Sequence, residues 1–172
     1  MRWVTRTCPY VDRTASAWLI KRFIDKNAEF VFIKWPREKP DPSLGIPFDI
    51  RGVELGHRDG KCTFEVIVEK YKIVDPIVKK IAEVVHAADI EEDIDKSPLA
   101  RGIKAILNGL RYMYKDDYKV LEEGIKIWDA LYAHFKIIEI MERYSEELKS
   151  MDRIGRIVFL RDRVSEAVER IK

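Results

Sequence analysis

All β-prone segments of this sequence lie within residues 2–50, so any sheet that the chain forms is small and N-terminal. RWVT at 2–5 and EFVFIKW at 29–35 are rich in β-branched and aromatic residues, and a helical segment at 13–25 separates them. A strand, a helix and a strand in this order predict two parallel strands joined by a right-handed crossover. FDI at 48–50 is a candidate third strand and follows a proline-rich loop.

The chain beyond residue 63 has the periodicity and the capping residues of helices. We expect helices at 63–71, from Asp75-Pro76, from Ser97-Pro98 to about 114, and from Asp116 or Asp117, followed by a helical tail with a break near 150–152. The predicted fold class is α+β, with a small, partly parallel N-terminal sheet, a predominantly helical body and a long helical C-terminus. Residues 1–135 are expected to form the domain, and 136–172 a helical extension of it.

The charges of the chain are balanced, which bears on its partners. Lys and Arg number 32 and Asp and Glu 30, for a net charge of +2. A nucleic-acid-binding domain normally has a one-sided basic surface, so we predict no direct binding to nucleic acid. No apolar run approaches the ~18 residues of a membrane span, and no secretory signal is present, so we expect a cytoplasmic protein without a membrane partner.

Four segments together resemble the C-terminal domain of the chromate-resistance protein ChrB family. They are VDRTASAWLIKRFID at 11–25, IPFDIRGVELGHRDGKCTFE at 46–65, VVHAAD at 84–89 and WDALYAHF at 128–135. Their order and spacing also fit, and the resemblance covers roughly residues 2 to 135. It implies a role in chromate resistance, a stress response, as a sensor or regulator, and it leaves catalytic activity open.

The resemblance has departures that bear on function. Longer members of the family carry a region ahead of this domain, so the chain is expected to be a stand-alone version of it. Family members often have a histidine before Val-Asp-Arg and a cysteine before the tryptophan; here these places hold Tyr10 and, nearby, Ser16-Ala17. A thiol at that position is therefore not available for redox chemistry.

Two pairs of residues form the candidate metal site. Glu54 and His57 are three residues apart in a glycine-punctuated loop, and His86 and Asp89 are three residues apart on a predicted helix. If the helix face packs on the loop, two histidines and two carboxylates converge, and such ligands suit a divalent metal ion, Zn, Fe, Mn or Ni. Alternatively, the first pair only holds the loop together, and the second lies on a solvated helix face.

A second group of residues suits an oxyanion, because chromate is a tetrahedral dianion that arginine forks and helix N-termini bind. Arg6, Asp12 and Arg13 lie at the turn from the first strand into the first helix. Alternatively, Asp12 caps that helix and Arg13 pairs with a carboxylate. Asp129, on the edge of an apolar stripe, needs a partner and either joins the metal or pairs with an arginine such as Arg13.

The thiol of Cys62 and the C-terminal tail are further candidates. Lys61, Arg58 and a helix start next to Cys62 lower the pKa of a thiol, so Cys62 is a redox candidate, although a buried inert thiol is the favoured interpretation. The amphipathic tail at 136–172 either covers the core or pairs with a second copy of the chain, giving a homo-oligomer through the C-terminal helices.

The sequence therefore predicts a chromate-resistance-type domain that binds a metal ion or a small inorganic anion and serves in chromate sensing or detoxification. The first alternative is a metal-dependent enzyme, either a hydrolase or a chromate reductase, that uses the His57/His86 site. The second alternative is a protein-interaction domain whose polar clusters are only structural.

Overall fold

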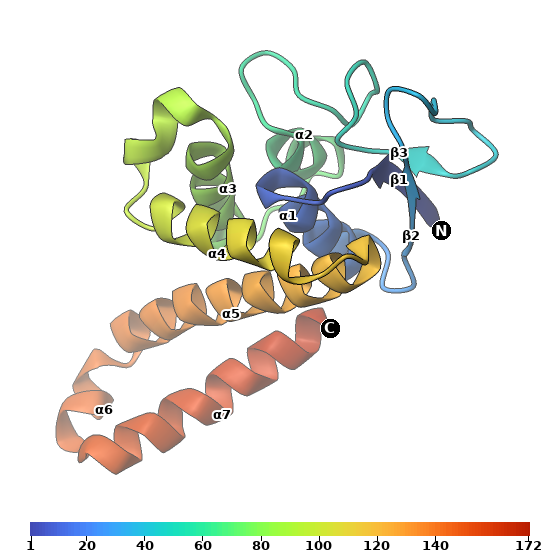
Figure 1. Cartoon of the computed structure of the whole chain (residues 1–172). Helices are drawn as coiled ribbons and strands as arrows, with labels where there is room; N and C mark the ends of the chain where they lie inside the picture. Colours follow the sequence, from blue (N-terminus) through green and yellow to red (C-terminus); the bar gives the residue numbers. More distant parts are fainter.

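The computed structural model describes residues 1–172 and combines a small sheet with a mostly helical body (Figure 1). The sheet has three parallel strands in the order β2-β1-β3, formed by β1 (Arg2–Arg6), β2 (Glu29–Ile33) and β3 (Ile46–Pro47). The predicted α+β class and the parallel pairing of the first two strands are confirmed.

The third strand directly precedes the predicted FDI segment and begins two residues earlier than expected. Its Pro47 lacks a backbone N–H, which the sheet tolerates because β3 is an edge strand. Phe48 still donates its N–H to the Val4 carbonyl, at 2.9 Å, and makes an isolated bridge with Leu55. Asp49 then has a left-handed backbone with φ of 49°, which ends the extended segment and prevents FDI from forming a strand.

Helix α1 (Val11–Leu19) is buried along its whole length and lies at the centre of the molecule (Figure 1). It continues as a π-helical turn, η1 (Ile20–Ile24), so the helix predicted at 13–25 is present and begins two residues earlier. α1 contacts α2, α3, α4 and α5. Its polar side chains must therefore find partners inside the protein, because an unpaired buried polar group is costly.

The other helices begin close to the predicted capping residues. They are α2 (Thr63–Lys70), α3 (Pro76–Asp89), the 3-10 helix η2 (Glu91–Lys96), α4 (Ala100–Met113), α5 (Asp117–Arg143), α6 (Ser145–Ser150) and α7 (Arg153–Ile171). Asp75, Asp116 and Asp152 each accept a hydrogen bond from the first turn of the helix that follows. The break predicted near 150–152 separates α6 from α7, and α4 begins three residues later than Ser97.

The last two long helices form an antiparallel pair in which α7 returns along α5 (Figure 1). Val168 and Ile171, near the end of α7, pack against the main core, and Val164 is buried. Ile154 and Val158, near its start, remain exposed. The tail thus covers part of the core with its last turns, whereas its first turns keep an apolar surface.

The main core extends from the sheet to α5. Trp3 on β1, Trp18 on α1 and Trp128 on α5 are fully buried in it. None of the helices is long and apolar enough to cross a membrane. The core fixes α1 against the start of α2 and against α3, which is the arrangement that positions the polar residues described next.

Candidate metal centre

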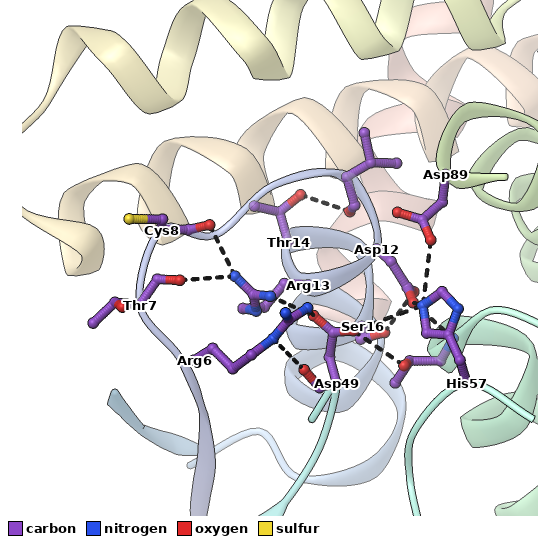
Figure 2. A network of polar contacts seen from close by, with 12 residues as sticks. Arg6, Thr7, Cys8, Asp12, Arg13, Thr14, Ser16, Asp49, His57 and Asp89 are labelled. Carbon is purple, nitrogen blue, oxygen red and sulfur yellow. Dashed lines mark hydrogen bonds and ion pairs between the residues drawn. The ribbon is translucent and has the colours of Figure 1, made fainter. Parts of the chain in front are cut away.

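Three carboxylates converge on one imidazole nitrogen next to the starts of α1 and α2 (Figure 2). The Nε2 atom of His57 lies 2.9 Å from Asp12 Oδ2, 3.3 Å from Asp89 Oδ2 and 3.8 Å from Asp49 Oδ1. One ligand atom each of Asp12, His57 and Asp89 lies within 4.8 Å of the others, close enough for the three to hold one metal ion. We call Asp12, Asp49, His57 and Asp89 the His57 cluster.

Asp12 is held in place by the start of another helix. Its carboxylate accepts hydrogen bonds from the backbone N–H groups of Thr63, at 2.7 Å, and Phe64, at 2.9 Å, and from the hydroxyl of Ser16, at 3.2 Å. The prediction that Asp12 caps its own helix is wrong, because α1 already begins at Val11 and its N-cap is Tyr10. Asp12 instead caps α2, whose positive dipole end favours an ionised carboxylate there.

Asp49 is the buried partner of two arginines. Arg13 Nη2 lies 2.8 Å from Asp49 Oδ2, and Arg6 Nη2 lies 3.4 Å from the same oxygen. Arg6 also donates from Nε to the Asp49 carbonyl, at 2.9 Å, and Arg13 donates to the carbonyls of Thr7 and Cys8. The geometry matches the alternative in which Arg13 pairs with a carboxylate, so the guanidinium of Arg13 is already engaged within the protein.

The crowding of negative charge shifts the pKa values of His57, Asp89 and Asp49. A hydrogen bond to Asp12 and the attraction of all three carboxylates raise the pKa of His57 to about 9, although partial burial opposes this. Burial and repulsion from Asp12 raise the pKa of Asp89 to about 7, and the same two causes raise the pKa of Asp49. A divalent cation among these oxygens would reduce the repulsion between the carboxylates, which contributes to the raised pKa values of Asp89 and Asp49.

His86 lies in a separate polar group on the neighbouring helices. Its Nδ1 is 2.7 Å from Glu65 Oε2, and its Nε2 is 2.7 Å from Asp93 Oδ2. The ligand atoms of Cys62, Glu65 and His86 also lie within 4.8 Å of one another. Burial lowers the pKa of His86, but the hydrogen bonds to the two carboxylates outweigh it and the pKa is raised. We call Cys62, Glu65, His86 and Asp93 the His86 cluster.

The structure therefore divides the predicted metal ligands. His57 and Asp89 come together as expected, whereas His86 lies in the second cluster. Glu54 lies in neither: its exposed side chain forms an ion pair with Lys70. The two residues could meet on one ion if this segment were helical or tightly turned, but it forms a loop in which Glu54 pairs with Lys70 instead.

Asp129 has a structural environment. Arg22 donates to it from Nε, at 2.9 Å, and from Nη2, at 2.7 Å, and Trp18 donates from Nε1 at 2.8 Å. Asp129 thus pairs with an arginine, as one alternative expected, but the partner is Arg22 rather than Arg13, because Arg13 is directed towards Asp49. This bidentate pair satisfies a buried carboxylate, and Asp129 belongs to neither group of possible metal ligands.

The two cysteines differ in environment. Cys62 is buried, and its burial together with the charge of Asp12 raises the pKa of the thiol above its usual range. In the absence of a metal ion, a thiol with a raised pKa is a poor nucleophile, which argues against redox chemistry at Cys62. Cys8 is exposed and has a positive φ of 59° in the turn between β1 and α1.

Sequence reasoning missed three members of these clusters. Asp49 stands in the FDI segment that was expected to be a strand, Asp93 in an acidic run after α3, and Glu65 in the first turn of α2. The capping-box position of Glu65 was a usable signal. Asp49 and Asp93 have no such signal, because their contacts depend on how distant segments pack.

Comparison with known proteins defines the class of this domain. Residues 3–135 match the family described as ChrB, C-terminal domain, and the chain belongs to that family. The Protein ChrB of Cupriavidus metallidurans is 34% identical over 137 residues, which are 78% of this chain and 40% of that protein. The chain thus spans less than half the length of this relative. No solved structure matches it.

The match confirms the resemblance that the four sequence segments indicated. Both clusters lie within the matched residues, and the part of the chain after residue 135, with most of the antiparallel pair, lies outside them. The chain is therefore a domain of the ChrB C-terminal type.

Proposed function

We propose that the His57 cluster binds a divalent metal ion and that the domain uses this ion in chromate sensing or detoxification. The observation that carries the proposal is the convergence of three carboxylate oxygens on one imidazole nitrogen. His57 Nε2, Asp12 Oδ2 and Asp89 Oδ2 would be the ligands, and Asp49 Oδ1 stands next to them. Nitrogen and oxygen ligands of this kind suit Zn, Mn, Fe or Ni.

The environment of the cluster supports a cation rather than a directly bound oxyanion. Arg13 is buried against Asp49, and only Arg6, whose side chain is 41% exposed, extends towards solvent. The N-terminus of α2, which would otherwise attract an anion, already holds the Asp12 carboxylate. A free oxyanion would therefore meet carboxylates that repel it and cations that are already paired.

A bound metal would itself provide the place for an oxyanion. Three protein ligands leave an open coordination position on ions such as Zn²⁺. The side chain of His57 is 49% exposed, so the cluster opens to solvent on the side of this residue. Chromate is a dianion and can coordinate a metal ion through one of its oxygen atoms, so it fits such a position. Chromate binding at the metal would connect metal binding with the family's role in chromate resistance.

Metal analysis of the purified protein tests the proposal. We expect one equivalent of Zn, Mn, Fe or Ni to be retained by the His57 cluster, and His57→Ala or Asp89→Asn to remove it. His134→Ala is a matched control because His134 contacts Phe135 and has no carboxylate at its ring. Asp59→Asn, an exposed acid in the loop of His57, is the matched carboxylate control. Equal metal content in the wild-type protein and all four variants would contradict the proposal.

Chromate added to the metal-loaded protein tests the second part. Retention of unchanged chromate after dialysis, lost in Asp89→Asn and kept in Asp59→Asn, would support binding at the metal. Steady consumption of chromate would move the assignment to an enzyme. Retention that is equal with and without metal would contradict an oxyanion position on the ion.

A further inference from the structure

We propose that the His86 cluster is a second metal site, selective for a thiophilic divalent ion such as Zn²⁺. Cys62 Sγ, Glu65 Oε2 and His86 Nδ1 are the ligands, and these atoms lie within 4.8 Å of one another without any ion. The inference uses none of the residues of the His57 cluster, so it does not depend on the function proposed above. It gives a role to Cys62, which has no role in that function.

Asp93 stands where a metal-binding histidine normally has the partner of its second ring nitrogen. A histidine that binds a metal through one ring nitrogen almost always donates the other N–H to a carboxylate or a carbonyl. His86 has this arrangement, because Nε2 contacts Asp93 Oδ2 at 2.7 Å while Nδ1 faces Glu65. Lys96 fixes the same Asp93 oxygen at 2.8 Å.

The ligands stand on rigid elements. Cys62 and Glu65 belong to the start of α2, and Glu65 also accepts the backbone N–H of Cys62 at 3.0 Å. His86 lies on α3, which packs against α2. Sites on helices hold their geometry better than sites on loops, so little rearrangement is needed to bind an ion.

The exposure of the ligands decreases from His86 and Glu65 to Cys62, so an ion could reach the buried thiol from the solvent side of the other two. The side chains of His86 and Glu65 are 21% and 26% exposed, whereas Cys62 is fully buried. The ion would displace the proton of the Cys62 thiol and that of His86 Nδ1, both of which leave to water. The Cys62 thiolate and the Glu65 carboxylate would together balance the charge of a divalent ion, and a water molecule would complete the coordination.

The two clusters would select different ions. Sulfur ligands favour Zn²⁺ and Co²⁺, whereas carboxylates and water favour Mn²⁺ and Mg²⁺. The His86 cluster has a sulfur atom, and the His57 cluster has only nitrogen and oxygen. A probe that reports sulfur bonded to the metal can therefore distinguish one site from the other within the same protein.

Cobalt absorption provides the test, because only thiolate bonded to Co²⁺ gives an intense near-ultraviolet charge-transfer band. We expect the band when Co²⁺ is added to the reduced full-length protein, and its loss in Cys62→Ser. Cys8→Ser is the matched control and keeps the band, since Cys8 lies in an exposed turn. His57→Ala also keeps it, so a failure of the His57 site leaves this result unchanged.

Two further variants protect the test against misfolding of Cys62→Ser, whose side chain is buried. Glu65→Gln is expected to weaken Co²⁺ binding while circular dichroism shows the native helix content. Asp93→Asn is expected to keep the band and to weaken Co²⁺ binding about 10- to 100-fold, as the loss of an orienting carboxylate does. Absence of the band in the wild-type protein, or its loss in Cys8→Ser but not in Cys62→Ser, would overturn the proposal.

Discussion

The two histidine clusters use similar residues in different charge arrangements. His57 comes from a loop and presents one nitrogen to three carboxylates, whereas His86 comes from a helix and presents each nitrogen to one carboxylate. In the first cluster three acids face one histidine, and Arg13 pairs with Asp49. In the second, two acids face one histidine, and Lys96 pairs with Asp93. The His57 cluster therefore has the greater need for a cation and the greater sensitivity to the loss of a charge.

Asp12 is expected to give the largest difference between the clusters. Asp12→Ala removes the cap of α2 and the partner of His57, and we expect the free energy of unfolding of the metal-free protein to fall by about 3–5 kcal/mol. Glu65→Ala, in the other cluster, removes a partly exposed contact and should cost only about 1 kcal/mol. Urea unfolding of both variants measures the difference, and equal losses would refute the comparison.

The two arginines at Asp49 provide the next test. Arg13→Ala leaves the buried carboxylate of Asp49 without its closest cation, so the free energy of unfolding is expected to fall by about 3 kcal/mol. Arg6→Ala removes a half-exposed partner of the same carboxylate and is expected to cost below about 1 kcal/mol. Urea unfolding under identical conditions compares the variants. A larger loss for Arg6→Ala would show that burial does not set the importance of these pairs.

The pH dependence of the metal-free protein tests the charge arrangement directly. The raised pKa of His57 means that the folded protein holds this proton more tightly than the unfolded one. The resulting stability is fully present below about pH 6.5, the ordinary value, and is lost as the pH rises through about 9. Because half of the imidazole is in solvent, the contribution should not exceed about 1 kcal/mol.

Unfolding midpoints measured from pH 6 to 10 check this expectation. His57→Gln should flatten the decrease, and His134→Gln should leave it unchanged. His86→Gln is expected to flatten it as well, because the pKa of His86 is raised in the same direction. A profile of His57→Gln that coincides with the wild type would show that the three carboxylates do not hold the proton.

Glu54 is expected to give the smallest effect. Its exposed ion pair with Lys70 contributes little to the free energy of unfolding, and its carboxylate lies outside both clusters. Glu54→Ala should therefore keep the metal content and the unfolding midpoint of the wild type, as measured by elemental analysis and thermal unfolding. A loss of metal in this variant would place Glu54 among the ligands and contradict the division of the predicted site.

Local signals in the sequence were sufficient for most of the fold. Asp75, Asp116 and Asp152 mark helix starts because the side chain of a cap bonds the backbone within a few residues. The third strand was displaced because the backbone of Asp49 turns left-handed and ends the extended segment. A helical turn or a strand depends on neighbours in sequence, and these are visible without a structure.

The candidate sites were predicted only in part, because their contacts join distant segments. His57 and Asp89 were named correctly as neighbours, but Asp12 reaches α2 across 51 residues and Glu65 reaches His86 across 21. The spacing of Glu54 and His57 indicated a shared site, and the loop geometry separates them. Residue type identifies which side chains can bind a metal, whereas the packing of α1, α2 and α3 decides which of them meet.

Helix α3 contributes Asp89 to one cluster and His86 to the other, one helical turn apart. If both clusters hold an ion and binding at one of them displaces α3, the affinity of the other changes as well. Thermodynamic linkage then requires reciprocity: the factor by which the first ion changes the affinity for the second equals the factor by which the second changes the affinity for the first. In that case the metal concentration needed to fill one site would depend on whether the other site is occupied. The occupancy of the domain would then depend on the relative concentrations of the two metals.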